Sequence, residues 1–372
     1  MRPMPSSRSG VVALPATALA ALSLLGLVTT SGCSATGSGR TATKSAIDAS
    51  THVVSAREYG YVRPAVDVRV VGGGPSAGHA IYRDPGPGGD LWDRVRQGST
   101  LGVTYHPRIE QASNDLRRNG DYLTDLNRRA RPYLHIIVGE LEHAGLPPEL
   151  ALLPEVESRY NPRAVSPKRA AGMWQFMPYT GTEMGLRQDG WYDARNDILA
   201  STRGAIAYLK QLRAEFDGDW ALALASYNAG PARVRAAQER NRAQGKPTDY
   251  WSLDLPTETE LYVPKFLAIA SMVREPGRYG LRMPTLENRA RLEVVEARDQ
   301  IDLAQAASAC GVSLQTLRDL NPGLKRNKTP SNGPHRVLVP VGTGARLRTA
   351  LAQGNRTAPA VADTRASGRG AS

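Results

Sequence analysis

Residues 146–162 read LPPELALLPEVESRYNP, and this stretch indicates the fold class of the chain. Three leucines and one glutamate recur in it at steps of four, three and four residues: Leu146, Leu150, Leu153 and Glu157. That spacing places all four on one face of a helix, and the prolines at 147 and 148 suit a first helical turn. The stretch therefore predicts a helix over 147–158 with a glutamate on its apolar face.

Glu157 is the first candidate for chemistry. A carboxyl group on an apolar face loses hydration, which raises its pKa and favours the protonated form that a general acid needs near neutral pH. A structural alternative is that Glu157 pairs with a buried arginine or caps a neighbouring helix, and this helix alone leaves both open. Glu155 stands four residues before Arg159, so we expect it on a solvated face in an ion pair.

The same helical periodicity continues on both sides of this stretch. Six more runs carry apolar residues at three- and four-residue spacings: 91–98, 107–118, 121–145, 198–216, 220–230 and 263–275. We therefore expect a mainly α fold, with a helical domain over residues 90–284.

A different pattern follows Pro284. RLEVVEA at 291–297 and RVLVPV at 336–341 are strand-like, and two short amphipathic runs that predict helices lie between them. This βααβ order predicts a small α+β domain over 291–341, with Cys310 as a buried core thiol. The tail 342–372 is rich in Ala, Gly, Thr and Arg, and we expect it to be disordered and basic.

The N-terminus indicates export. Arg2 and Arg8 precede a long uncharged, largely apolar stretch, which is typical of a secretory signal. Thr30-Ser31-Gly32-Cys33 resembles a bacterial lipobox, so we expect a signal peptide over 1–32 and lipidation of Cys33. Residues 33–89, rich in Gly, Pro and Ser, then form a flexible tether. An uncleaved transmembrane anchor is the alternative.

Composition narrows the function classes. The net charge of +12 and the pI near 9.9 favour an acidic polymer or surface as partner, and the export signal argues against nucleic acid. The 2 Cys and 6 scattered His include no zinc spacing and no HExxH, and no phosphate-binding glycine loop is present. We therefore expect neither a metal nor another cofactor.

Three motifs in fixed order carry a family resemblance: Glu157-Ser158, AAGMWQ at 170–175 and SYNAG at 226–230. They resemble the soluble-lytic-transglycosylase family, which is related to goose-type lysozyme, and the likeness covers residues 90–284. The region 291–341 is similar to the LysM-like glycan-binding module that often follows this catalytic domain. The resemblance implies a lysozyme-like helical domain that cleaves the MurNAc–GlcNAc β-1,4 bond of peptidoglycan without water, leaving 1,6-anhydro-MurNAc ends.

The resemblance also implies residue roles, with Glu157 as the single acid and base. It assigns substrate contacts or orientation of that acid to six residues: Ser158, Met173, Gln175, Tyr227, Asn228 and Tyr262. Glu258 is expected to be structural. An ordinary glycosidase needs a second carboxylate. No acid is clearly placed for that role, and Asp193 and Asp197 are no more than candidates.

Two other functions stay open from sequence. One is a hydrolytic muramidase on the same fold, and the other is a non-catalytic lipoprotein that binds peptidoglycan. In each reading the partners are glycan strands and, through Cys33, a membrane. The expected location is the periplasmic side of the outer membrane, because Ser34 follows the cysteine.

Overall fold

The computed structural model describes residues 88–101 and 105–357. The predicted signal peptide, Cys33, all but the last two residues of the tether, and the tail beyond 357 lie outside the described residues. Within the described ranges, no helix is both long enough and apolar enough to cross a membrane.

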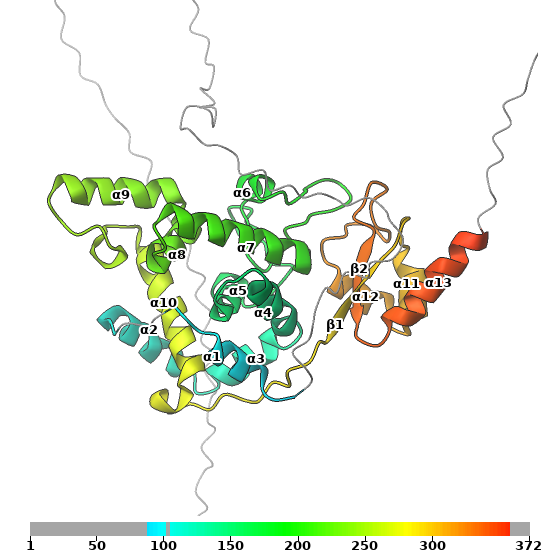
Figure 1. Cartoon of the computed structure of the whole chain (residues 1–372), viewed down its shortest axis with the longest axis horizontal. Helices are drawn as coiled ribbons and strands as arrows, with labels where there is room; N and C mark the ends of the chain where they lie inside the picture. Colours follow the sequence, from blue (N-terminus) through cyan, green and yellow to red (C-terminus); the bar gives the residue numbers. More distant parts are fainter. Residues whose placement is uncertain (1–87, 102–104, 358–372) are drawn as a thin grey trace, which may run out of the picture. The chain divides into compact units, whose positions relative to one another are not determined.

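The mainly α fold class is confirmed. Ten α-helices and three short 3-10 helices occupy the described residues before 290 (Figure 1): α1 Leu91–Gln97, α2 Pro107–Arg117, α3 Tyr122–Ala130, α4 Leu134–His143, η1 Pro148–Leu152, α5 Leu153–Ser158, α6 Pro178–Glu183, α7 Ile198–Glu215, α8 Trp220–Ala229, α9 Pro231–Ala243, η2 Tyr250–Ser252, α10 Thr257–Arg274 and η3 Pro276–Tyr279.

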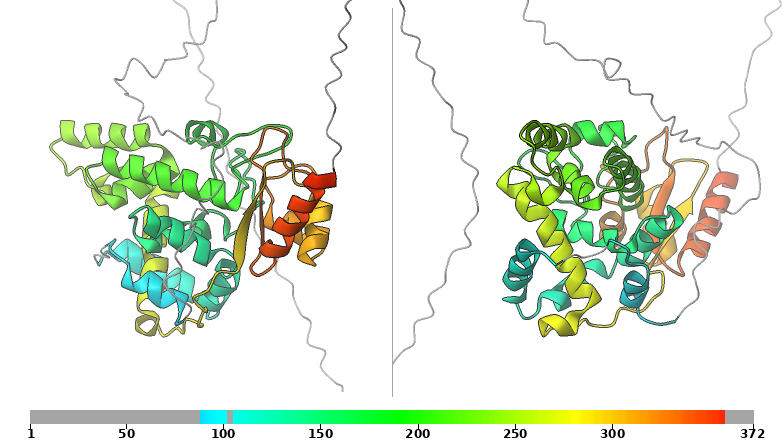
Figure 2. Two further views of the ribbon diagram at one scale, coloured as in Figure 1. Left: turned by 45° about the vertical axis from the view of Figure 1, so that its right-hand side comes forward. Right: turned by 60° about the vertical axis from the view of Figure 1, so that its left-hand side comes forward.

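Helix α10 is the central element of this helical region. It is drawn in yellow in Figures 1 and 2. It packs against α2 and α8 and also contacts η1 and α5. Twelve of its 18 residues are buried, Phe266 and Met272 completely. A helix buried nearly all round is surrounded by others, so α10 holds both α5 and α8 in place.

Some predicted helix boundaries were wrong. The run 121–145 forms two helices, α3 and α4, separated at Arg131–Tyr133, where Pro132 cannot donate a backbone hydrogen bond. The run 147–158 begins as a 3-10 helix and becomes α-helical only at Leu153. The polar helix α9 was not predicted, because only three of its 13 residues are buried and it has no continuous apolar stripe.

The C-terminal module, defined here as residues 291–357, has the predicted strand–helix–helix–strand order. β1 (Leu292–Glu296) and β2 (Arg336–Pro340) pair antiparallel, with Leu292 opposite Pro340. α11 (Leu303–Cys310) and α12 (Leu314–Leu320) lie between them in sequence. Cys310 is a buried free thiol, as expected.

The predicted end of this module at 341 was too early. Helix α13 (Gly344–Thr357) follows β2, and its Leu347 is buried with Val295 and Val339. Thus residues 344–357 are helical, not disordered as the composition of the tail had suggested. A few apolar residues spaced along an otherwise polar helix are enough to attach it to a core.

Candidate active site

Glu157 and Tyr262 meet across two helices. Glu157 lies in the last turn of α5, and its Oε1 accepts a hydrogen bond from the Tyr262 hydroxyl of α10. Tyr262 is only 6% exposed, so its hydroxyl is held towards the carboxylate by the surrounding core. The structure therefore joins two predicted site residues that are 105 positions apart in sequence.

The environment of Glu157 favours its protonated form. Burial is the main cause and raises its pKa from 4.5 to about 7, and the negative charge of Glu258 acts in the same direction. The hydrogen bond from Tyr262 and the positive charge of Lys265 oppose this shift. A carboxyl group with this pKa can give up a proton and take one back near neutral pH.

Ser158 connects α5 to the active-site loop, defined here as residues 169–176. Its hydroxyl donates to the carbonyl of Met173 at 2.8 Å and accepts from the backbone N–H of Asn161 at 3.1 Å. The Met173 side chain is 1% exposed and lies in the core, so it is the Met173 carbonyl that faces Ser158. Ser158 thus orients the end of α5 through this contact.

The Gln175 side chain stabilises the same loop through two backbone carbonyls. Its side-chain nitrogen donates to the carbonyl of Gly172 at 2.7 Å and to that of Ala164 at 3.3 Å. Its backbone is left-handed, with φ of 49°, an uncommon conformation for a non-glycine residue that marks a constrained turn. Gln175 therefore helps to hold the loop in shape.

Tyr227 and Asn228 come from the end of α8 and connect it to the active-site loop and to α10. The Tyr227 hydroxyl donates to the Trp174 carbonyl of the loop at 2.9 Å. Burial, and next the charge of Glu157, raise the pKa of the Tyr227 phenol, which keeps it protonated. Asn228 Oδ1 accepts from the hydroxyl of Thr259 at 2.8 Å, linking α8 to α10.

The prediction for Glu155 was wrong. Its side chain is 3% exposed and forms an ion pair with Arg129 of α3 at 2.5 Å. The Tyr122 hydroxyl also donates to Glu155, at 3.3 Å. The helix is distorted by its 3-10 start, and α3 covers the face that a regular isolated helix would leave in solvent. The Arg129–Glu155 pair therefore attaches α5 to α3.

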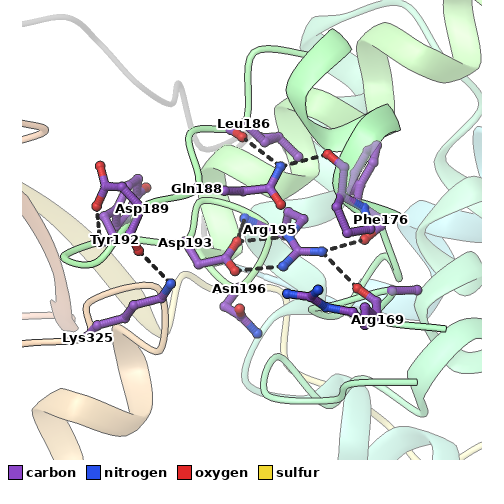
Figure 3. Close-up of polar contacts among 12 residues, drawn as sticks. Arg169, Phe176, Leu186, Gln188, Asp189, Tyr192, Asp193, Arg195, Asn196 and Lys325 are labelled. Carbon is purple, nitrogen blue, oxygen red and sulfur yellow. Dashed lines mark hydrogen bonds and ion pairs between the residues drawn. The ribbon is translucent and has the colours of Figure 1, made fainter. Parts of the chain in front are cut away.

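Asp193 and Asp197 have structural partners. Asp193 accepts from Nε and Nη2 of Arg195, at 3.0 and 2.8 Å (Figure 3). Asp197 caps α7 by accepting from Ala200 N, and it also pairs with Arg336. Each carboxylate is therefore neutralised by an arginine, which does not suit a second catalytic acid or base. Within residues 88–101 and 105–357, no group of three or more His, Cys, Asp or Glu could hold a metal ion.

Sequence reasoning missed two contributors to the site, Lys265 and Thr259, and expected Glu258 to be only structural. Glu258 and Lys265 act on the charge of Glu157 from the same helix as Tyr262. Thr259 holds Asn228. The spacing of these residues around Tyr262, at four before, three before and three after, is a helical signal that could have indicated them.

Replacing Tyr262 with phenylalanine removes the donor that lowers the pKa of Glu157. We therefore expect that pKa to rise above 7, so that the alkaline limb of the kcat–pH profile moves up by about one pH unit, the size expected for a hydrogen bond to a charged group. The control is Tyr179→Phe, since Tyr179 is 74% exposed on α6. A limb that stays in place, or moves to lower pH, contradicts the assigned contact.

Two segments of the chain match known domain families. Residues 136–249 match the transglycosylase SLT domain, and residues 291–356 match the LysM-like domain of the lytic transglycosylase MltD. The second match extends to 356, in agreement with α13 as part of the module. The resemblance predicted from the three sequence motifs is confirmed.

Curated relatives are similar over a larger part of the chain. Over 268 residues, or 72% of this chain, it is 41% identical to the membrane-bound lytic murein transglycosylase D of Escherichia coli K12, and the counterpart from strain O6:H1 gives the same values. The chain covers 59% of the length of these relatives. A solved lytic transglycosylase Slt from Pseudomonas aeruginosa is 23% identical over 46% of this chain and 26% of its own, with a TM-score of 0.28.

Proposed function

Because the chain carries a transglycosylase SLT domain followed by a LysM-like domain, we propose that it is a peptidoglycan lytic transglycosylase. Its substrate would be the MurNAc–GlcNAc β-1,4 bond, and its product a glycan ending in 1,6-anhydro-MurNAc. The observation that carries the proposal is Glu157, a carboxyl group with a pKa of about 7 held by Tyr262. One group with this pKa suits both proton transfers of the reaction.

The reaction needs no water and returns the enzyme unchanged. Protonated Glu157 gives its proton to the glycosidic oxygen as the bond to the muramic acid C1 breaks. The N-acetyl group of the same sugar stabilises the positive charge at C1. Glu157, now a carboxylate, takes the proton from the C6 hydroxyl, and that oxygen bonds to C1 to close the anhydro ring. The Tyr262 hydroxyl donates to the carboxylate between the two transfers.

The other site residues support this cycle as positioning groups. Ser158 holds the end of α5 against the active-site loop, and Tyr227 holds the same loop from α8. The arrangement keeps α5, the loop and α8 in a fixed relation. A fixed geometry lowers the barrier because reacting groups meet in the right orientation.

Mass spectrometry of sugars released from purified sacculi tests the proposed function. We expect muropeptides that are one water lighter than reducing ones. Reducing ends would identify a hydrolytic muramidase instead. Binding to sacculi without any release would identify a non-catalytic peptidoglycan-binding protein. Either of the last two outcomes contradicts the proposal.

We also propose an attachment and a place for the chain. Cys33 would be lipidated after cleavage of residues 1–32, and the body over 90–284 would act on glycan from the periplasmic side of the outer membrane. The LysM-like module would contact the same glycan strands. Labelled palmitate should enter the full-length protein and not the Cys33→Ala variant, and labelling of both would contradict the assignment.

A further inference from the structure

A bridging segment, residues 187–197, lies between the active-site loop and the C-terminal module (Figure 3). On one side it contacts Arg169 and Phe176, the two ends of the loop. On the other side it contacts Lys325 of the module. Its two carboxylates, Asp193 and Asp197, are each paired with an arginine, so neither is free for catalysis.

Arg195 is the link from the bridging segment to the loop. Its Nη1 donates to the carbonyl of Arg169 at 2.9 Å and to that of Phe176 at 3.3 Å. Asp193 holds the other two nitrogens of the guanidinium, and both side chains are only 11% exposed. A carboxylate that accepts from two nitrogens of an arginine fixes the orientation of the guanidinium. Arg195 therefore holds the two ends of the loop at a fixed spacing.

The backbone of the bridging segment also touches the middle of the loop. A Cβ atom built on Gly172 would lie 1.7 Å from the carbonyl oxygen of Arg195. The active-site loop and the bridging segment are therefore in direct backbone contact at Gly172. A movement of the bridging segment must be transmitted to the loop, since no side chain lies between them to absorb it.

The module holds the bridging segment from the opposite side. Two backbone hydrogen bonds of 2.9 Å cross this junction, from Asp193 N to Gly323 O and from Lys325 N to Trp191 O. Arg336 of β2 pairs with Asp197 at 3.0 Å, with both side chains about 15% exposed or less. These contacts bind the module to the middle and to the C-terminal end of the bridging segment.

At Gly323 the module packs closely against the bridging segment. A Cβ atom there would lie 3.0 Å from the Asp193 carbonyl oxygen, from Asp197 Cβ and from the Tyr192 ring. Close packing of this kind responds to the addition of a single methyl group. By contrast, a Cβ atom on the exposed Gly190 in the same segment would meet nothing within 4 Å.

We propose that the C-terminal module is a positioning element of the active site, in addition to any glycan that it binds. The connection runs from Gly323 and Arg336 through the bridging segment and Arg195 to the loop, whose Met173 carbonyl holds Ser158 beside Glu157. The proposal rests on the proposed transglycosylase function. Arg195 and Arg336 are positioning residues, because they act on Glu157 only through the loop.

Point variants in the full-length chain test this coupling on short, peptide-free glycan oligomers. Gly323→Ala should lower kcat about tenfold with KM within twofold of wild type, because a small misplacement of catalytic groups affects turnover more than binding. Gly190→Ala adds the same methyl group to the same region and should behave as wild type. Arg336→Met should resemble Gly323→Ala, and Arg336→Lys should restore part of the loss.

The outcomes separate coupling from simple binding or unfolding. Thermal midpoints above the assay temperature show that the variants are folded. Partial recovery of kcat in Arg336→Lys shows in addition that the loss in Arg336→Met comes from the missing charge. If kcat stays within twofold of wild type in both Gly323→Ala and Arg336→Met, the proposal is overturned. It is also overturned if only KM rises, which indicates lost glycan contacts alone. A wild-type protein without activity would instead overturn the proposed function.

Discussion

Replacing Glu157 with glutamine should reduce kcat by about a thousandfold or more while leaving binding to sacculi unchanged. Glutamine has nearly the same shape, but its amide can neither give a proton to the glycosidic oxygen nor take one from the C6 hydroxyl. General acid–base groups contribute about 10²–10⁴-fold each, and Glu157 serves in both steps. Release of anhydro products from sacculi, measured beside a binding assay, checks the expectation.

The same variant has an expected effect on stability that depends on pH. The pKa of Glu157 is about 7 in the folded chain and 4.5 in the unfolded chain, where the carboxyl group is not buried. The folded state therefore loses stability as the pH rises above 4.5, because the carboxyl group ionises more readily in the unfolded chain. This loss grows up to about pH 7 and is then complete. Glu157→Gln removes it, so we expect a gain of roughly 3 kcal/mol in unfolding free energy at pH 8 and little change at pH 4.

Glu239→Gln, on the exposed face of α9, is the matched control for both measurements. It should change neither turnover nor the pH dependence of unfolding. Substantial turnover in Glu157→Gln would show that another acid performs the reaction. A variant that is less stable than wild type at pH 8 would contradict the burial that raises the pKa.

The second large effect is expected for Gly172→Ala in the active-site loop. Gly172 has φ of 84°, and its added Cβ would lie 1.7 Å from the Arg195 carbonyl oxygen. Side chains disfavour this backbone region, and the contact cannot be relieved without moving the loop or the bridging segment. We expect a loss of about 3 kcal/mol or more in unfolding free energy, which is typical of strain combined with overpacking, and about a hundredfold lower kcat.

Gly185→Ala separates the two causes. Gly185 has a similar φ of 74°, but a Cβ atom there meets nothing within 4 Å. It therefore shows the backbone strain without the collision, and we expect a loss of only about 1 kcal/mol with kcat near wild type. Equal effects of the two substitutions, in denaturant unfolding and in turnover, would contradict the role given to the contact with Arg195.

The sequence by itself determined much of the helical framework and the candidate acid. The spacing that puts Glu157 on an apolar face follows from local periodicity, which does not depend on the rest of the fold. The βααβ order of the module was predictable for the same reason. By contrast, α9 and α13 were missed, because each has too few apolar residues to give a periodic signal.

Only the tertiary structure decided which polar groups lie together. Glu155 was expected in solvent but is buried against Arg129. Helix α3 covers the face of α5 that carries Glu155, and the sequence of α5 alone does not indicate that α3 packs there. Tyr262 was predicted by resemblance, and the packing of α10 on α5 places its hydroxyl on Glu157.

The connection from Arg336 to the active-site loop likewise exists only in the folded chain. Arg336 and Asp197 are 139 residues apart, and no local pattern pairs them. Periodicity reports the face on which a residue lies, but not the element that covers that face. The partners of a buried charge are fixed by packing between distant segments, so they become visible only when those segments are in place.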